Sequence, residues 1–473
     1  MKYIKKLKYE TNNNPDIIYR KINLNNINLT LIYSESLTSG DKISDFIIRS
    51  LNNLQNFNPT LQIIQNSISN FKVIVGKTYE ELVKYLNNGF SILLLENNDN
   101  FLILETKSNN TRSITTPNTE QAIRGSKDSF VENYQTNINL IKKRIKTNNL
   151  WIKNINIGKY TDTIISIIYI KGIAKKKLIK NIYNNISKIN IDGIINSGTI
   201  KNLISKNNIL PTIKTTERPD ITCNALLEGK IVILVDNDPY VLILPAVLNN
   251  FFETIEDNYS NNINTSFTRA LRNICFWISL LTPGIYIALI NFNQEILPTE
   301  LLISFAIQRN NVPFPAFFET FTMIISFEIL RETDLRVPAF VGSALSIVGA
   351  LILGEAAVNA GIVSPIVIII TAITAISSLS FTEFDLINSL RWYRLIFMLG
   401  ATFLGIIGIV IIFIFFIIKL SCLESYNVPY LTPYIPFDKI GIKNSIYKSN
   451  VKNDTKRSKF LSNNYIKQRN DKI

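Results

Sequence analysis

Four long apolar runs lie in the second half of the chain, at residues 274–292, 340–358, 362–379 and 395–418. The last run has no charged residue, and as a helix it would extend roughly 36 Å, against about 30 Å for the hydrocarbon core of a bilayer. Buried helices of soluble proteins contain shorter apolar runs. The pattern therefore predicts an all-α polytopic membrane domain over residues 263–422.

Residues 299–336 follow a different pattern within this domain. Two apolar stretches there are interrupted by prolines and carry acidic side chains. This pattern favours a pair of re-entrant or interfacial helices, and a fifth and a sixth crossing remain the alternative. The residues that mark this segment as a candidate gate or docking surface are Glu300, Pro313, Pro315, Glu319 and Glu328.

The region before residue 263 contains the same order of elements twice. A strand at 29–33 leads into a helix at 41–51, and a strand at 164–170 leads into a helix at 174–186. Further along, Gly89 and Gly229 each precede a strand, a turn rich in Asn and Asp, and a second strand. We expect two similar α/β subdomains at 25–148 and 149–262, after an N-terminal tail at 1–24. Chance recurrence of a common strand and helix order remains the alternative.

The distribution of basic residues predicts how the chain is oriented in the membrane. The chain has a formal net charge of +14. Arg269 and Arg272 precede the first span and a basic tail follows the last, so both ends are expected on the cytoplasmic side, with the tail at 423–473. Basic clusters at 142–146 and 175–177 could also contact nucleic acid, but no aromatic platform accompanies them, and we expect no nucleic-acid partner.

Residue types exclude several kinds of chemistry. The sequence has no histidine, three scattered cysteines and no phosphate-binding glycine loop, which removes Ser-His catalysis and zinc sites of the usual kind. Two pairs of carboxylates remain, Glu217 with Asp220 and Asp236 with Asp238, and their contexts favour a helix N-terminus and a β-turn. We expect no enzymatic activity, no cofactor and no metal.

Several segments bring a known family into view, because they follow one another in that family's order over residues 25–437. The chain resembles the A subunits of GerA-type spore germination receptors. The segments that carry the resemblance include 121–132, 136–144, 216–220, 297–300, 312–319, 328–338, 354–365 and 428–430. Within them, the residues that resemble the family's motifs in the α/β region are Arg124, Gly125, Asn137, Glu217, Arg218, Pro219 and Asp220.

The resemblance implies a subunit of a nutrient sensor in the spore inner membrane. It implies a homo-oligomer around a central pore, a transporter-like B subunit, a lipoprotein C subunit and contact with membrane lipids. The complex would be a ligand-gated ion channel, and residues 299–336 would form a gate or a docking surface for the B subunit. A SpoVAF-like subunit that amplifies germination, and a membrane scaffold without conductance, remain alternatives.

The position of Glu355 is relevant to a pore independently of the family resemblance. Glu355 lies in an apolar span, where a charge costs about 2.5–3.5 kcal/mol on insertion scales, so it should face water, a partner charge or a pore. Small neighbours allow helices to approach closely, and the candidate pore or intersubunit set is Glu355, Gly349, Gly354 and Val358. The alternative is that Glu355 only reaches the lipid headgroups.

The chain departs from the family in three places. Asn293 stands where the family usually has a histidine before Glu295, so no imidazole can be essential there. A turn that is typically Asp-Gly-Thr-Pro is Asp-Asn-Asp-Pro at 236–239, and we expect it to survive because Asn tolerates left-handed backbone. Residues beyond 437 match nothing in the family, and we expect them to be disordered.

Overall fold

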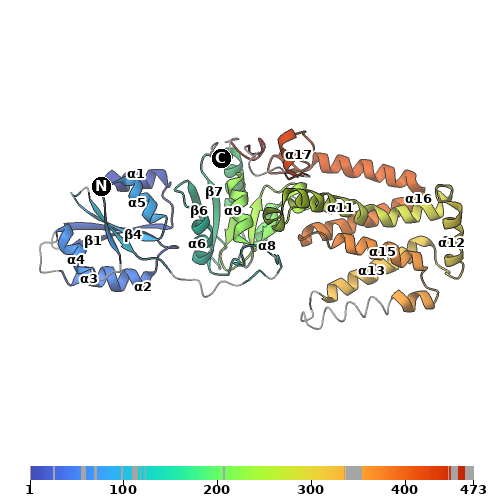
Figure 1. The fold of residues 1–473 in the computed structure, drawn as a ribbon, viewed down its shortest axis with the longest axis horizontal. Coiled ribbons are helices and arrows are strands. Elements are labelled where there is room, and N and C mark those ends of the chain that lie inside the picture. Colours follow the sequence, from blue (N-terminus) through green and yellow to red (C-terminus); the bar gives the residue numbers. More distant parts are fainter. Residues whose placement is uncertain are drawn as a thin grey trace.

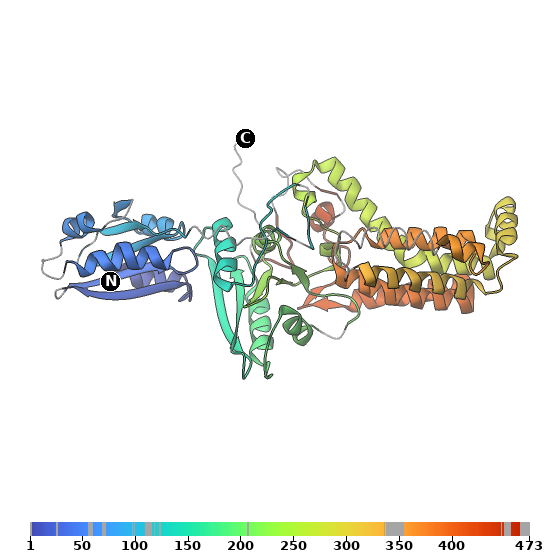
Figure 2. The ribbon, with the colours of Figure 1, turned by 90° about the horizontal axis from the view of Figure 1, so that it is seen from below.

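The protein is described here by a computed structural model, which covers the chain except residues 1, 25–26, 55–59, 69–71, 97, 99, 109–115, 118, 123, 206–207, 335, 337–353, 446, 449–455 and 464–473. Two sheet-containing units and a bundle of long helices follow one another along its longest axis (Figure 1). The view from below shows the helices of the bundle running roughly parallel to that axis (Figure 2). We call the bundle end next to the sheets its base and the opposite end its tip.

The first unit is a five-stranded antiparallel sheet in the order β1-β2-β4-β5-β3. Its strands are β1 (Ile17–Leu24), β2 (Ile27–Ser34), β3 (Val73–Gly76), β4 (Phe90–Leu95) and β5 (Phe101–Glu105). One face packs against α1 (Lys2–Glu10) and α5 (Tyr79–Leu86). The opposite face packs against a helical stretch made of α2 (Gly40–Lys42), a π-helical segment (Ile43–Ile48) and α3 (Arg49–Asn52), and against α4 (Leu61–Ser67).

Burial on both faces explains why the β4 sequence is apolar throughout rather than alternating. Ile92 and Leu94 face α1 and α5, whereas Leu93 and Leu95 face the helices on the other side. Successive strand residues point to opposite faces, so a strand between two layers of helices needs an apolar side chain at every position.

The second unit repeats this plan element by element. Its strand order is β6-β7-β9-β10-β8, again antiparallel. Its strands are β6 (Leu150–Ile157), β7 (Thr163–Ile170), β8 (Lys214–Thr216), β9 (Ile231–Val235) and β10 (Val241–Leu244). The helices are α6 (Tyr134–Arg144) and α9 (Pro219–Leu227) on one face, and α7 (Lys176–Ser187) and α8 (Ser197–Ile204) on the other. The predicted pair of similar α/β subdomains is confirmed.

Backbone geometry also agrees at the positions that suggested the repeat. Gly89 and Gly229 both have positive φ, +81° and +93°, and they lie one and two residues before the equivalent strands β4 and β9. Asn237 has φ +63° in the turn between β9 and β10, so asparagine does occupy the left-handed position there.

Two predicted boundaries need correction. Residues 2–24 are not a separate tail, because Leu7 of α1 is fully buried and β1 pairs with β2 over eight residues. Helix α6 lies before residue 149 but belongs to the second unit, since Tyr134, Ile138 and Ile141 pack in its core. The boundary between the units therefore falls in the chain that precedes α6. The two units contact each other through an ion pair between Lys142 and Asp16.

The helical region begins with a short 3₁₀ turn (Leu248–Phe251) and α10 (Glu256–Tyr259). It continues with α11 (Asn262–Asn291), a second 3₁₀ turn (Gln294–Ile296), α12 (Thr299–Arg309), α13 (Ala316–Asp334), helical residues 354–359, α15 (Pro365–Ser378) and α16 (Phe384–Cys422). Among the described residues, α11 and α16 are long and apolar enough to cross a membrane, and α15 is apolar but shorter. Of the four expected spans, most of 340–358 lies outside the described residues.

Helix α16 is a hairpin, which corrects the single helix predicted over 395–418. Gly405 has φ +59° and ψ −138°, and the chain reverses there. The ring centroids of Tyr393 and Phe416 lie 4.7 Å apart, whereas in one straight helix these residues would be separated by about 35 Å. The two arms, 384–404 and 406–422, are about 31 and 25 Å long, so the chain leaves the base and returns to it.

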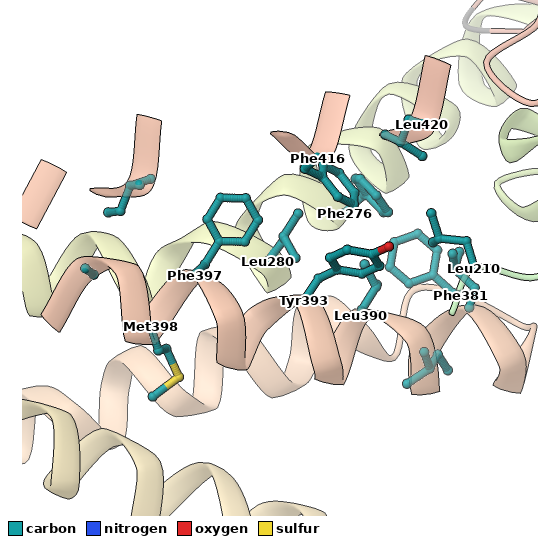
Figure 3. Close-up of a cluster of buried hydrophobic side chains, with 14 of the residues drawn as sticks. Leu210, Phe276, Leu280, Phe381, Leu390, Tyr393, Phe397, Met398, Phe416 and Leu420 are labelled. Carbon is teal, nitrogen blue, oxygen red and sulfur yellow. The ribbon is translucent and has the colours of Figure 1, made fainter. Parts of the chain in front are cut away.

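The core of the bundle forms between α11 and the two arms of α16. Figure 3 shows Phe276 of α11 and Phe416 of the second arm facing each other beside Tyr393 of the first. Close approach in this core uses glycine, because a Cβ on Gly284 would lie 3.2 Å from the Phe397 carbonyl oxygen. The core continues without interruption into the second unit through Leu210 and Phe252.

The C-terminal segment returns to the second unit. It contains β11 (Glu424–Ser425), β12 (Val428–Pro429) and α17 (Lys439–Ser445). Leu461 packs with Val247 and Val428, and Ser462 forms an isolated β-bridge with Ala174. The expectation of disorder beyond residue 437 is therefore wrong for the described parts, 438–445, 447–448 and 456–463. Leu461 docks through apolar contacts, and Ser445 and Lys448 form hydrogen bonds with α11.

Candidate functional site

Two of the carboxylates of helix α13, Glu319 and Glu328, lie nine residues apart and so about 14 Å apart along the helix axis. Both were predicted as residues of a gate or docking surface. Because α13 runs from tip to base, Glu319 lies near the tip and Glu328 near the base. Each carboxylate is paired with arginine inside an otherwise apolar bundle.

At the tip, Glu319 joins three helices. Its side chain is fully buried and forms an ion pair with Arg309 of α12 at 3.3 Å. The other carboxylate oxygen accepts hydrogen bonds from the backbone N–H and the hydroxyl of Ser364, at 3.1 and 2.9 Å. Ser364 is the N-cap of α15, so a single carboxylate holds α12 and the start of α15 against α13. A buried charge of this kind is stable only when it is paired and hydrogen-bonded.

At the base, Glu328 lies among three arginines. It forms ion pairs with Arg331 at 3.3 Å, Arg391 at 2.9 Å and Arg394 at 3.7 Å. The last two belong to the first arm of α16, so this cluster joins α13 to α16. One carboxylate against three guanidinium groups leaves the base of the bundle positively charged.

Arg394 also donates a hydrogen bond to a backbone carbonyl of α11 that Pro283 leaves without its helical donor. Pro283 has no N–H, so the carbonyl of Ser279, four residues earlier, lacks its helical donor. Arg394 Nε donates a hydrogen bond to that carbonyl oxygen at 2.8 Å. The contact satisfies a backbone group that would otherwise be buried without a partner, and it ties α11 to α16.

The remaining predicted residues of this segment lie apart from the two carboxylates. Glu300 is exposed in the first turn of α12. Pro313 and Pro315 are exposed in the turn between α12 and α13, and the Pro315 carbonyl accepts the N–H of Glu319 at 3.2 Å. They separate the two helices rather than form a common site with Glu319.

Glu355 is exposed on the helical residues 354–359. The chain turns at Gly361, which has φ +66° and lies beside the Asn311 carbonyl oxygen at the tip. Gly354 is buried near Ile368, and Val358 packs against the bundle core. Gly349, the fourth residue of the candidate pore set, lies outside the described residues.

The predicted structural motif comes together where the linker before α6 lies on the second unit. Arg218, which is 1% exposed, donates to both carboxylate oxygens of Asp220 at 3.1 and 2.8 Å. It also donates to the carbonyl oxygens of Glu120 and Ser126, at 3.0 and 2.9 Å. We call this set of contacts the linker latch.

Most other residues of that motif support the same linker. Glu217 accepts hydrogen bonds from the Thr119 and Glu120 backbone N–H groups at 2.6 and 3.0 Å, and Pro219 starts α9 at a position where its missing N–H costs nothing. Asn137 Oδ1 accepts the N–H of Val131 at 2.8 Å. Gly125 has φ +132°, and a Cβ there would lie 2.7 Å from the Tyr259 ring. Arg124 is exposed.

None of the ion pairs at the junction between the second unit and the bundle was predicted from the sequence. Lys201 pairs with Asp385, Lys214 lies 3.7 Å from Glu383, and Asp257 pairs with Arg269 and Arg272 at 2.8 and 2.6 Å. Burial raises the pKa of Glu383 to about 7, although Lys214 opposes the shift. No local pattern marks these residues, because their partners are distant in sequence.

Comparisons with known proteins identify the family of the chain. The family model described as "Bacillus/Clostridium GerA spore germination protein" matches residues 5–460, beyond the range that motifs alone had suggested. Spore germination protein KA of Bacillus subtilis is 38% identical over 98% of this chain and 86% of its own, and spore germination protein A1 of the same organism is 33% identical over 94% and 92%.

A solved structure is also similar to part of the chain. The crystal structure of the N-terminal domain of the A subunit of the Bacillus megaterium spore germinant receptor GerK3 is 28% identical, with a TM-score of 0.41. The match covers 52% of this chain and 94% of that domain. On the family match over nearly the whole chain, this protein belongs to the GerA family of spore germination proteins.

Proposed function

We propose that this chain is the A subunit of a nutrient germinant receptor in the spore inner membrane, where it oligomerises and contributes to a ligand-gated ion channel. Its partners would be a transporter-like B subunit and a lipoprotein C subunit. Family membership and the apolar helices support a membrane-associated germination protein.

The observation that carries the channel is the position of Glu355. It lies six residues before the turn at Gly361, about 9 Å along a helix from the tip, and it is exposed in the protomer. An ionised side chain at that depth is unfavourable against lipid and favourable against water or another subunit. Glu355 is exposed in one protomer, and contact with lipid would be unfavourable for its charge. Both points favour a position of Glu355 in the wall of a water-filled path between protomers.

Charge distribution supports an orientation with the sheets on the cytoplasmic side. The base carries Arg269, Arg272, Lys419 and the three arginines around Glu328. In the described helices the tip carries Arg309, which Glu319 neutralises, together with exposed Glu295 and Glu300. Cytoplasmic ends of membrane helices are enriched in Lys and Arg. Both sheet units and the C-terminal segment lie at the base, and so on one side of a membrane.

The test is release of monovalent cations from spores that carry Glu355→Gln, measured for each nutrient. Glu295→Gln is the matched control, since it removes an exposed carboxylate at the same end of the bundle. Altered release at normal protein abundance, with the control unchanged, supports a conducting path beside Glu355. Unchanged release in both variants would reject that role and favour the scaffold. Deletion that slows the response to every nutrient would favour a SpoVAF-like amplifier.

A further inference from the structure

A large cavity lies where three parts of the molecule meet. It has a volume of about 960 Å³, and its walls come from the second unit, the segment that leads into α11 and the C-terminal segment. Its lining includes Lys230 and Asn250 of the first two parts and Lys456 of the third. The cavity is separate from the carboxylates of α13 and from Glu355.

Two buried lysines form the floor of this cavity. Lys214 and Lys230 are 6% and 5% exposed. Lys230 Nζ donates to Asn250 Oδ1 at 2.7 Å, and Lys214 Nζ donates to the Asn250 carbonyl oxygen at 3.1 Å. Both ammonium groups, one at the start of β8 and one just before β9, are therefore held in place by Asn250.

The two lysines differ in how their charge is balanced. Lys214 has a carboxylate partner, Glu383, at 3.7 Å. Among the described residues, the acceptor of Lys230 is a neutral amide oxygen, and no carboxylate lies within ion-pair distance of its Nζ. Burial lowers the pKa of Lys230; the charges of Glu228 and Glu253 oppose this shift, and the charge of Lys214 adds to it. A buried ammonium group without a carboxylate in direct contact is costly, and an anion in contact with it would lower that cost.

In the lining as a whole, basic residues outnumber acidic residues. Five lysines and two arginines line the cavity, against two glutamates, Glu228 and Glu253. Glu253 accepts a hydrogen bond from Asn249 at 3.0 Å, and Glu228 also has an interaction partner. A cavity walled by low-dielectric protein and lined by an excess of cations concentrates anions.

We propose that this cavity binds a phosphate group, with Lys230 as its principal ligand and Lys214 and the rim lysines as supporting cations. Phosphate offers several acceptor oxygens, which suits ammonium groups that approach from the floor and the rim. The group can come from free phosphate or from the headgroup of an acidic phospholipid, since the cavity lies at the base of the bundle. A bound phosphate would bridge the second unit and the C-terminal segment.

The experiment uses the full chain in nanodiscs of pure phosphatidylcholine, with inorganic phosphate as the probe. Titration calorimetry gives the dissociation constant, with chloride at equal ionic strength as the reference. We expect Lys230→Met to weaken phosphate binding at least tenfold and Lys456→Gln, at the exposed rim, to weaken it about threefold. Lys180→Met is the matched control, because Lys180 is exposed on the same unit outside the cavity and its loss should change nothing.

Absence of phosphate binding by the wild-type chain, or equal affinity in the wild type and Lys230→Met, overturns the proposal. If Lys230→Met does not fold, Lys456→Gln decides, and an unchanged affinity in that variant overturns it. A second titration in nanodiscs that contain phosphatidylglycerol identifies the source. Weaker apparent phosphate affinity there supports the site with a lipid headgroup as its occupant, and an equal affinity supports it with free phosphate.

Discussion

Replacing Arg218 by lysine tests whether the linker latch orders the chain between the two units. The substitution keeps the positive charge and most of the side-chain volume, but it removes the planar fork of donors. Arg218 makes four hydrogen bonds, two to Asp220 and one each to the carbonyl oxygens of Glu120 and Ser126. A lysine ammonium group beside Asp220 can keep the ion pair. It cannot also reach the carbonyl oxygens of both Glu120 and Ser126.

The size of the effect follows from those contacts. A hydrogen bond from a charged donor contributes about 1.5–3 kcal/mol, and the two lost bonds hold linker carbonyls that water can partly solvate once they are released. The lower end of that range for each bond gives a loss of about 3 kcal/mol in the stability of the docked linker. Since every 1.4 kcal/mol is a factor of ten, the population of undocked linker should rise about 100-fold.

Limited trypsin digestion of the full chain measures this population. Arg124 and Lys127 lie in the linker and are exposed, but a protease needs the surrounding chain to detach before it can cleave. Mass spectrometry separates cleavage after these two residues from cleavage elsewhere. Arg20→Lys, an exposed position on β1, is the control. Equal cleavage rates in Arg218→Lys, Arg20→Lys and the wild type would refute the latch.

Three further predictions concern the junction, the hairpin and a turn. Burial raises the pKa of Glu383 to about 7, so the folded chain keeps a proton that the unfolded chain releases near pH 4.5. Stability should be complete below that pH and fall as pH rises to 7, and Glu383→Gln should flatten this decline in thermal melts. Gly405→Ala should cost about 1–3 kcal/mol, since φ is +59° and its Cβ would lie 2.8 Å from Phe292 Cβ; an unchanged melting temperature would contradict this. Asn237→Gly should be tolerated while Asn237→Val loses about 1–2 kcal/mol, as chemical denaturation would show.

The sheet units were largely predictable because their signals are local. Strands between two layers of helices need apolar residues at every position, and the turn around Asn237 needs residues that tolerate positive φ. The repeated order of those signals was enough to predict two similar units. The N-terminal boundaries of the two units were not predictable. Each unit begins with a short amphipathic helix, α1 or α6, that packs on a sheet whose strands lie later in the sequence.

The hairpin of α16 could not be predicted from the sequence for a different reason. Residues 395–418 contain no charge and no proline, so nothing in their composition interrupts a helix. The reversal depends on Gly405, and glycine is common in straight membrane helices. What fixes the turn is a tertiary contact, since Asn293 Oδ1 accepts the N–H of Ile406 at 3.4 Å and Phe292 lies against Gly405.

The role of Arg394, in contrast, follows from chemistry that the sequence does contain. Proline at 283 leaves the carbonyl of residue 279 without a donor, and a buried carbonyl in an apolar bundle needs one. The sequence places three arginines, Arg331, Arg391 and Arg394, near the ends of apolar runs. Which of them reaches α11 depends on how the helices pack, so the need was predictable and the donor was not.

The base of the bundle is packed more extensively than its tip. At the base, an apolar core continues from Phe276 into the second unit, and arginine clusters join α13, α11 and α16. At the tip, α12 has no buried residue, and its ion pair to Glu319 is made by Arg309, which is still 22% exposed. Separating the base requires exposing a continuous core and several buried charges. Displacing α12 breaks the ion pair of Arg309 with the buried Glu319, which keeps its hydrogen bonds from Ser364, and removes Phe305 from the edge of the core. Displacement of α12 is therefore the less costly movement, and the second unit is expected to move together with the base of the bundle.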